Sequence, residues 1–356
     1  MSSFREVAES VAESLLYPNI PELGEKAPER KKGPEPFIPH HLGVKLDDPL
    51  DEISASDLKK LSIEECYQIL EYFQAQKGSI TSIIESVRGQ ISLARNMVRA
   101  IEGMKKGNKA LDEKLHHVMA CEKAFLRDLQ SAGLHIQYHS DLEPEEIDEK
   151  PALILTTHQG GGGENYIHQA LTGIPGRLVV KGSLMEIPYI KDGLQERGAI
   201  PVSRDALKDP KKRAQEIKKI AEQIVEEMGR GGNVYIFIEG TRSRDGAIAA
   251  TNGRQKWAKE ILAEIEEQAS KVNFQKLLLV VNTMTAMPDA PEEKLLKTRF
   301  RAQGTTLSAC LMRADHFTDL ELENPYDQTT LFGSARAALK DMVIEAILLY
   351  QEQLKQ

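Results

Sequence analysis

From about residue 135 onward, the sequence alternates between short apolar runs and longer amphipathic segments, and this alternation limits the fold more than any other feature. The apolar runs have the length of buried strands, and the segments between them have the length and periodicity of helices. Such alternation predicts a largely parallel sheet with helices on its faces. We expect strands at 134–138, 152–156, 177–180, 199–202, 234–238 and 276–281, and helices at 210–228, 254–269 and 335–354.

The part of the chain before residue 135 has a different pattern. Amphipathic periodicity predicts three helices at 63–76, 80–104 and 111–132, whose apolar faces indicate core packing, with lipid contact as the alternative. Residues 1–50 join a short amphipathic segment to a stretch rich in proline, glycine and charge. The predicted organisation is an N-terminal arm (1–50), a helical domain built as a bundle or cap (51–135), and an α/β domain (136–356).

Composition argues against several classes of protein. A net charge of −8 and an aromatic content of 5% disfavour binding to nucleic acid. Three cysteines without CxxC spacing predict no disulfide framework and a reducing compartment. No apolar stretch approaches the ~20 residues that cross a bilayer, and the N-terminus lacks a signal pattern. We expect a cytoplasmic or stroma-like location, with any membrane contact peripheral.

The first polar segment of interest follows the predicted strand 152–156. It contains His158, then Gln159, four glycines and Glu164. A neutral imidazole can take a proton from a hydroxyl, and a carboxylate on its other ring nitrogen fixes the tautomer. Ligands of open α/β sheets bind at the carboxyl ends of the strands, which is where this segment lies. The alternative is a flexible glycine loop with a histidine at a strand end.

The second polar segment follows the predicted strand 234–238 and contains Glu239, Gly240, Thr241 and Arg242. Guanidinium groups bind phosphate through paired hydrogen bonds and stay charged at every relevant pH, so this loop suits an anionic substrate. Surface ion pairing is the alternative role for its arginine. No ligand cluster has the spacing of a metal site. Together, the two segments predict a transferase that acts on a phosphorylated alcohol.

Several short segments share their order and spacing with one known family. They are Thr157-His158-Gln159, Lys181 with Ile187-Pro188 downstream, Gly198-Ala-Ile200 followed by Arg204, and Phe237-Ile-Glu239-Gly240-Thr241-Arg242-Ser243. With these segments, the chain resembles the glycerophospholipid acyltransferase superfamily, which includes glycerol-3-phosphate and lysophosphatidate acyltransferases. The resemblance covers roughly residues 150–285, and the segment from Phe237 to Ser243 is the most specific.

The resemblance implies a function and a set of roles. His158 would be the general base and Glu164 the acid that orients it. A fatty acyl group would pass from acyl-CoA or acyl carrier protein, the co-substrate, to a hydroxyl of glycerol-3-phosphate, without metal or other cofactor. The helical N-terminal unit resembles the soluble glycerol-3-phosphate enzymes, and lysophosphatidate is the alternative acceptor. The acceptor site would be formed by Lys181, Arg204, Glu239, Gly240, Thr241 and Arg242, with the arginines holding the phosphate.

This chain departs from the family pattern at two places. Five residues, rather than four, separate His158 from its acid, and that acid is Glu164 rather than aspartate. A glycine run can loop out and glutamate is longer, so the pair can still meet; without that contact, a non-catalytic phospholipid-binding relative is the alternative. A further segment of the family pattern, which follows the four above, carries a proline, whereas the predicted strand 276–281 continues here through Val281 to Asn282. That departure leaves the preferred acyl donor open.

Overall fold

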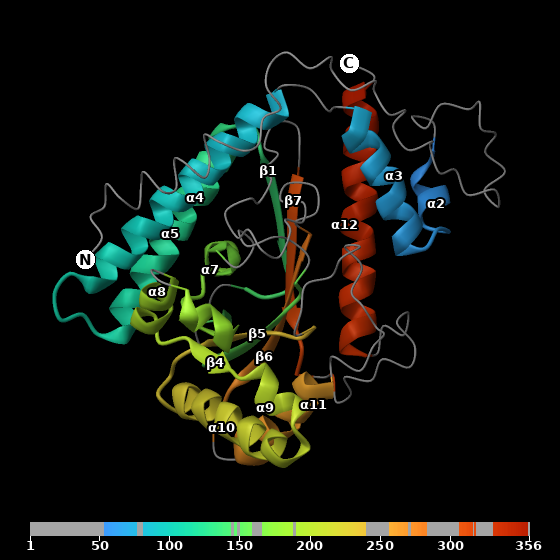
Figure 1. Ribbon diagram of the computed structural model, residues 1–356. Helices are drawn as coiled ribbons and strands as arrows, with labels where there is room; N and C mark the ends of the chain where they lie inside the picture. The colour runs from blue at the N-terminus through green and yellow to red at the C-terminus, as the bar shows by residue number, and fades with distance from the viewer. Residues whose placement is uncertain are drawn as a thin grey trace.

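The computed structural model describes residues 53–76, 81–143, 146–147, 150–158, 166–187, 190–239, 256–269, 272–282, 306–315, 317 and 330–354. Within these ranges, seven strands form one sheet in the order β1-β7-β6-β2-β5-β3-β4 (Figure 1). The predicted α/β class, a mostly parallel sheet flanked by helices, is confirmed. The strands are β1 (His135–Ser140), β2 (Ala152–Thr156), β3 (Arg177–Lys181), β4 (Ile200–Val202), β5 (Val234–Phe237), β6 (Gln275–Asn282) and β7 (Thr306–Arg313).

The centre of the sheet is parallel, and one edge reverses direction. β6, β2, β5, β3 and β4 run parallel to one another, whereas β7 is antiparallel to β6 and parallel to β1. All five residues of β2 are buried, because this strand has neighbours on both sides and helices over both faces. The six predicted strands form with small shifts at their ends. β7 was not predicted.

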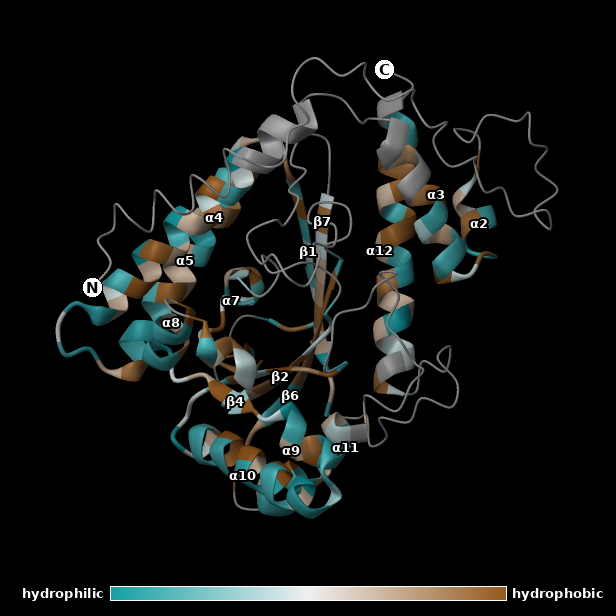
Figure 2. Ribbon diagram, in the orientation of Figure 1, coloured by the Kyte–Doolittle hydropathy of each residue, from teal (hydrophilic) through white to brown (hydrophobic). Residues whose placement is uncertain are grey.

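Helices cover both faces of this sheet and divide its core into two. Side chains alternate across β2, so that Leu153 and Leu155 join one core while Ala152 and Ile154 join the other. Figure 1 shows α3 and α12 on one side of the sheet and α4 and α5 on the other, and in Figure 2 the central strands are mainly hydrophobic. The first core includes α2 (Ala55–Leu58), α3 (Ile63–Gln76), α9 (Arg204–Lys208), α10 (Pro210–Gly229), α11 (Lys256–Gln268) and α12 (Leu331–Leu354); the second includes α4 (Thr81–Lys105), α5 (Leu111–Ser131), α7 (His168–Thr172), η4 (Gly182–Glu186) and α8 (Ile190–Glu196).

The three predicted N-terminal helices all form, and they are shared between the two faces. α3 packs against α12, while α4 and α5 pair with each other on the opposite face. Residues on both sides of position 135 therefore contribute to the same cores, and the proposed domain boundary there remains a prediction. The predicted arm, residues 1–50, lies outside the described residues. None of the described helices is long and apolar enough to cross a membrane.

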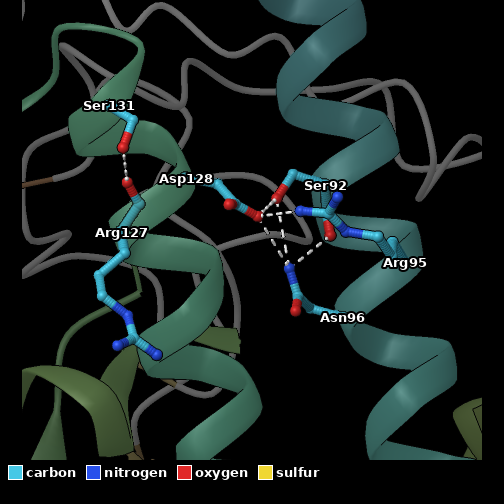
Figure 3. Close-up of polar contacts among 6 residues, drawn as sticks. All are labelled: Ser92, Arg95, Asn96, Arg127, Asp128 and Ser131. Carbon is cyan, nitrogen blue, oxygen red and sulfur yellow. Dashed lines mark hydrogen bonds and ion pairs between the residues drawn. The ribbon is translucent and has the colours of Figure 1, made fainter.

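A polar cluster fixes the pairing of α4 with α5 (Figure 3). One carboxylate oxygen of Asp128 on α5 accepts hydrogen bonds from Ser92, Arg95 and Asn96 on α4. Asn96 is fully buried, and its Nδ2 also donates to the Ser92 carbonyl at 2.9 Å. Because these directional contacts involve a charged acceptor, they favour one alignment of two helices whose apolar contacts alone are less specific.

A second buried polar group joins α5 to the α/β part of the chain. Glu122 is fully buried, and its carboxylate accepts hydrogen bonds from the Ala170 N–H at 3.3 Å and from Gln169 Nε2 at 3.4 Å. Arg197 Nη2 lies 3.7 Å from the same carboxylate. Burial raises the pKa of Glu122 to about 7, and the Arg197 guanidinium partly offsets that rise. Glu122 thus anchors the first turn of α7 to the N-terminal helices.

This raised pKa predicts how stability depends on pH. Between the unfolded pKa of 4.5 and the folded pKa of about 7, the folded state binds more protons at Glu122 than the unfolded state does. The stabilisation is therefore complete below pH 4.5 and is lost as pH rises through 7, by up to about 3 kcal/mol. We expect the unfolding free energy of wild type, relative to Glu122→Gln, to fall between pH 5 and pH 8 in urea titrations. Parallel curves of unfolding free energy against pH for the two proteins would contradict this expectation. Glu226→Gln, which changes an exposed glutamate, serves as the control.

Candidate active site

The register of two neighbouring strands brings His158 and Glu239 together. Thr156 of β2 pairs with Phe237 of β5, so the residues two positions further along each strand lie at the same level. The backbone N–H of His158 donates a hydrogen bond to the carboxylate of Glu239, with 2.7 Å between N and Oε2. Glu239 is only 2% exposed, so this acceptor is shielded from water. The carboxylate therefore fixes the backbone from which the His158 side chain extends.

The residue before His158 is held from the other side, by β6. The N–H of Thr157 donates to the Leu279 carbonyl at 3.2 Å, and Thr157 Oγ1 accepts from the Val281 N–H at 3.2 Å. The backbone of Thr157 and His158 is thus fixed by strands on both sides. A functional group that extends from such a rigid support keeps its geometry better than one on a free loop.

The His158 ring lies at the edge of the sheet, on the face that α7 covers. It is partly exposed, and its centroid lies 4.6 Å from that of Phe237, with the planes tilted by 40°. Phe237 also contacts the buried ring of His168, at 5.3 Å between centroids. Aromatic packing therefore restricts the orientation of His158 on one side and leaves part of its ring accessible.

Two cationic residues lie at the carboxyl ends of β3 and β4. Lys181 ends β3 and pairs with Val202 of β4, and Arg204 follows two residues later as the first residue of α9. The Ser203 side chain caps this helix by accepting a hydrogen bond from the Ala206 N–H at 3.2 Å. Lys181 and Arg204 are both exposed. Adjacent strand ends thus present two positive groups to solvent, an arrangement that suits an anionic ligand.

A glycine explains how the chain enters β4. Gly198 lies between α8 and β4 with a φ of +61°, in the left-handed region that glycine adopts without strain. Its carbonyl accepts a hydrogen bond from Arg177 Nε on the neighbouring strand β3. This turn leads into β4, where Val202 pairs with Lys181 two residues before Arg204.

Four of the predicted site residues are described, and all four lie at the carboxyl edge of the parallel strands. They are His158, Lys181, Arg204 and Glu239. The other four, Glu164, Gly240, Thr241 and Arg242, lie outside the described residues, so the pairing of His158 with Glu164 remains a prediction. Sequence reasoning did not identify the contact between Glu239 and the His158 backbone. Within the described ranges, no group of three or more histidine, cysteine, aspartate or glutamate side chains could hold a metal ion.

Comparisons with known proteins show what the segment around this edge of the sheet is similar to. Residues 135–264 match the family model described as Acyltransferase. Among solved structures, the chain is similar to PlsC, the 1-acyl-sn-glycerophosphate (LPA) acyltransferase from Thermotoga maritima, with 13% sequence identity and a TM-score of 0.45 over 77% of this chain and 98% of that one. No curated protein matches the sequence. The matched segment, residues 135–264, carries all four described site residues.

Proposed function

We propose that this protein is an O-acyltransferase that moves a fatty acyl group from acyl-CoA or acyl carrier protein to a hydroxyl of glycerol-3-phosphate. The observation that carries this proposal is the placement of His158 at a strand end, fixed by Glu239 and flanked by exposed cations on β3 and β4. A base beside an anion-binding surface suits an acceptor that has both a hydroxyl and a phosphate.

The proposed reaction is a direct transfer. The neutral His158 imidazole accepts the proton of the acceptor hydroxyl while that oxygen attacks the thioester carbonyl. The tetrahedral intermediate collapses, the C–O bond is kept, the C–S bond breaks, and the imidazolium returns its proton to the departing sulfur. Glu239 holds the backbone of His158 through these steps, and Glu164 is the proposed acid that orients the ring.

The proposed acceptor site lies on the β3–β4 side of His158. Arg204 and Lys181, joined by Arg242, would bind the phosphate, since guanidinium and ammonium groups pair with its oxygens. Lysophosphatidate carries the same phosphate and is the alternative acceptor. We favour glycerol-3-phosphate because a helical unit before residue 135, without a membrane-spanning stretch in the sequence, is the organisation that the resemblance associates with the soluble glycerol-3-phosphate enzymes.

An acceptor and donor panel tests the proposal. Purified protein would be given acyl-CoA or acyl carrier protein with glycerol-3-phosphate, lysophosphatidate or glycerol, and the products identified by mass spectrometry. We expect an acylated glycerol-3-phosphate as the main product and little transfer to glycerol, which lacks the phosphate. Transfer to lysophosphatidate alone would show that lysophosphatidate, and not glycerol-3-phosphate, is the acceptor. The absence of transfer from every donor, with folded protein and vesicles present, would overturn the proposal.

The phosphate-binding role of Arg204 predicts a selective effect on KM. Arg204→Gln is expected to raise the KM for glycerol-3-phosphate roughly tenfold, with a smaller change in kcat, because the phosphate is bound equally before and during the reaction. Steady-state kinetics with varied acceptor would measure this change. Lys208→Gln, at the other end of the same helix α9, is the matched control. An unchanged KM in Arg204→Gln would remove this residue from the acceptor site.

A further inference from the structure

The last residue of β6 is a buried asparagine with unused hydrogen-bonding groups. Asn282 is 0% exposed, and neither its Nδ2 nor its Oδ1 has a hydrogen-bond partner in the part of the chain that the structure describes. Buried polar atoms in folded proteins are paired in the great majority of cases, because an unpaired one destabilises the fold. An apolar residue at this position would pack without that penalty. Asn282 therefore calls for a partner that is not part of the described chain.

The neighbouring strand β7 does not supply that partner. Asn282 pairs across the strands with Ser308, but the Ser308 hydroxyl donates to Gln137 Oε1 at 3.2 Å. Gln137 in turn donates from Nε2 to Glu345 of α12 at 2.9 Å. This hydrogen-bonded row leads away from Asn282 and leaves its amide without a partner among the described residues.

On the β2 side, Asn282 lies beside the proposed reaction centre. Thr157 accepts a hydrogen bond from Val281, the residue before Asn282, and His158 follows Thr157. Neighbouring strands are about 4.8 Å apart, so Asn282 is within reach of groups bound close to His158. Alternation along β6 places Asn282 on the α12 face, whereas the His158 ring lies on the α7 face against Phe237. A ligand that contacts both residues must therefore cross the edge of the sheet and reach the buried Asn282 side chain.

Combined with the proposed acceptor site, the strand order indicates which substrate would extend toward Asn282. Along the sequence β6-β2-β5-β3-β4, His158 separates Asn282 from Lys181 and Arg204. The proposed acceptor reaches from the cations to His158, where its hydroxyl attacks the thioester. The donor, which meets the acceptor at His158, would therefore continue on the opposite side, over the end of β6.

The chemistry of an asparagine side chain limits the partner further. Nδ2 donates and Oδ1 accepts, so a group that satisfies both atoms must itself accept and donate. A fatty acyl chain has neither capacity, and a phosphate oxygen only accepts. A secondary amide has both, and the pantetheine arm that carries the sulfur of acyl-CoA and of acyl carrier protein has such an amide close to the thioester. We infer that Asn282 binds this amide of the donor, an inference that depends on the proposed function.

Replacement of Asn282 by leucine tests this assignment. Leucine has a similar volume and no polar atoms, so Asn282→Leu is expected to unfold at the same or a higher urea concentration than wild type. The KM for acyl-CoA is expected to rise roughly tenfold, while the KM for glycerol-3-phosphate stays the same. A folded variant with an unchanged donor KM, or with a raised acceptor KM instead, would overturn the assignment.

Truncated donors locate the contact within the thioester. An acyl thioester of N-acetylcysteamine keeps the amide near the sulfur, whereas the S-ethyl thioester of the same acid lacks it. We expect Asn282→Leu to lose activity relative to wild type with the first donor and to match wild type with the second. Equal losses with both donors would contradict a contact to the amide.

A matched control separates this role from burial alone. Asn96 on α4 is another fully buried asparagine, with Oδ1 unpaired among the described residues and far from β6 in the fold. Asn96→Leu is expected to change stability and to leave the donor KM unaltered. If wild type transfers no acyl group from any thioester, the proposed function and this inference fail together. If wild type is active and Asn282→Leu keeps its donor KM, only the assignment of Asn282 fails.

Discussion

Replacing His158 with alanine is expected to lower kcat for acyl transfer by roughly 10²–10⁴-fold, because the attacking hydroxyl loses the base that accepts its proton. The KM values for donor and acceptor should change much less, since the phosphate and the donor are bound by other residues. The Glu239 contact involves the backbone N–H of His158 rather than its ring. The alanine variant therefore keeps this contact, and its fold should be preserved.

Two further variants show whether the loss is specific to proton transfer. His158→Gln keeps a polar side chain of similar length but cannot act as a base, so its kcat should be as low as that of the alanine variant. His116→Ala removes an exposed histidine of α5 and is expected to leave kcat unchanged. Initial rates with saturating donor and acceptor would provide the comparison. Retention of more than a tenth of kcat in both His158 variants would exclude this residue as the base.

Glu239→Ala is expected to reduce kcat by about 10²-fold while the acceptor KM changes little. The carboxylate fixes the His158 backbone through a 2.7 Å charge-assisted hydrogen bond, and a displacement of about 1 Å at a reacting group can cost about 10²-fold in rate. Glu239→Gln keeps a side-chain carbonyl that can accept the same hydrogen bond, so it should recover part of the activity. Glu239 is thus a positioning residue in this proposal.

The kinetic pattern distinguishes positioning from binding of the acceptor. If Glu239 contacts glycerol-3-phosphate, as the family resemblance implies, the acceptor KM should rise in both Glu239 variants. Glu227 offers a matched control, because this buried glutamate pairs with Arg177 at the start of β3, the opposite edge of the sheet. Glu227→Ala is expected to lower the unfolding midpoint and to leave kcat of the folded protein unchanged. A KM effect without a kcat effect in Glu239→Ala would contradict the positioning role.

The fold could be predicted from sequence wherever one physical signal dominated. The central parallel strands are apolar throughout because both of their faces are buried, and this pattern is visible in the residues themselves. β7 was missed because Thr306, Ser308 and Cys310 interrupt its apolar pattern. Ser308 is tolerated in the buried strand because Gln137 of β1 accepts its hydrogen bond. That partner is distant in the sequence, so local reasoning had no means to find the strand.

The candidate site was predictable residue by residue but not in its internal contacts. His158 and Glu239 were each identified, and each was given a separate role. Their contact depends on the pairing of Thr156 with Phe237 across a long stretch of chain, and no local pattern specifies that register. The unused amide of Asn282 had no sequence signal either, since it depends on how Ser308 directs its own hydroxyl. The pairing of strands that are distant in the sequence thus determined the contacts that the sequence motifs could not specify.

The division of the hydrophobic core between the two faces of the sheet has a consequence for the evolution of this protein. The segment that matches the acyltransferase family begins at residue 135, but Phe73 of α3 and Phe125 of α5 complete the cores on either side of it. The matched segment therefore buries part of its apolar surface against helices that precede it in the chain. Because the two parts pack together, a substitution in one part changes which substitutions the other can accept.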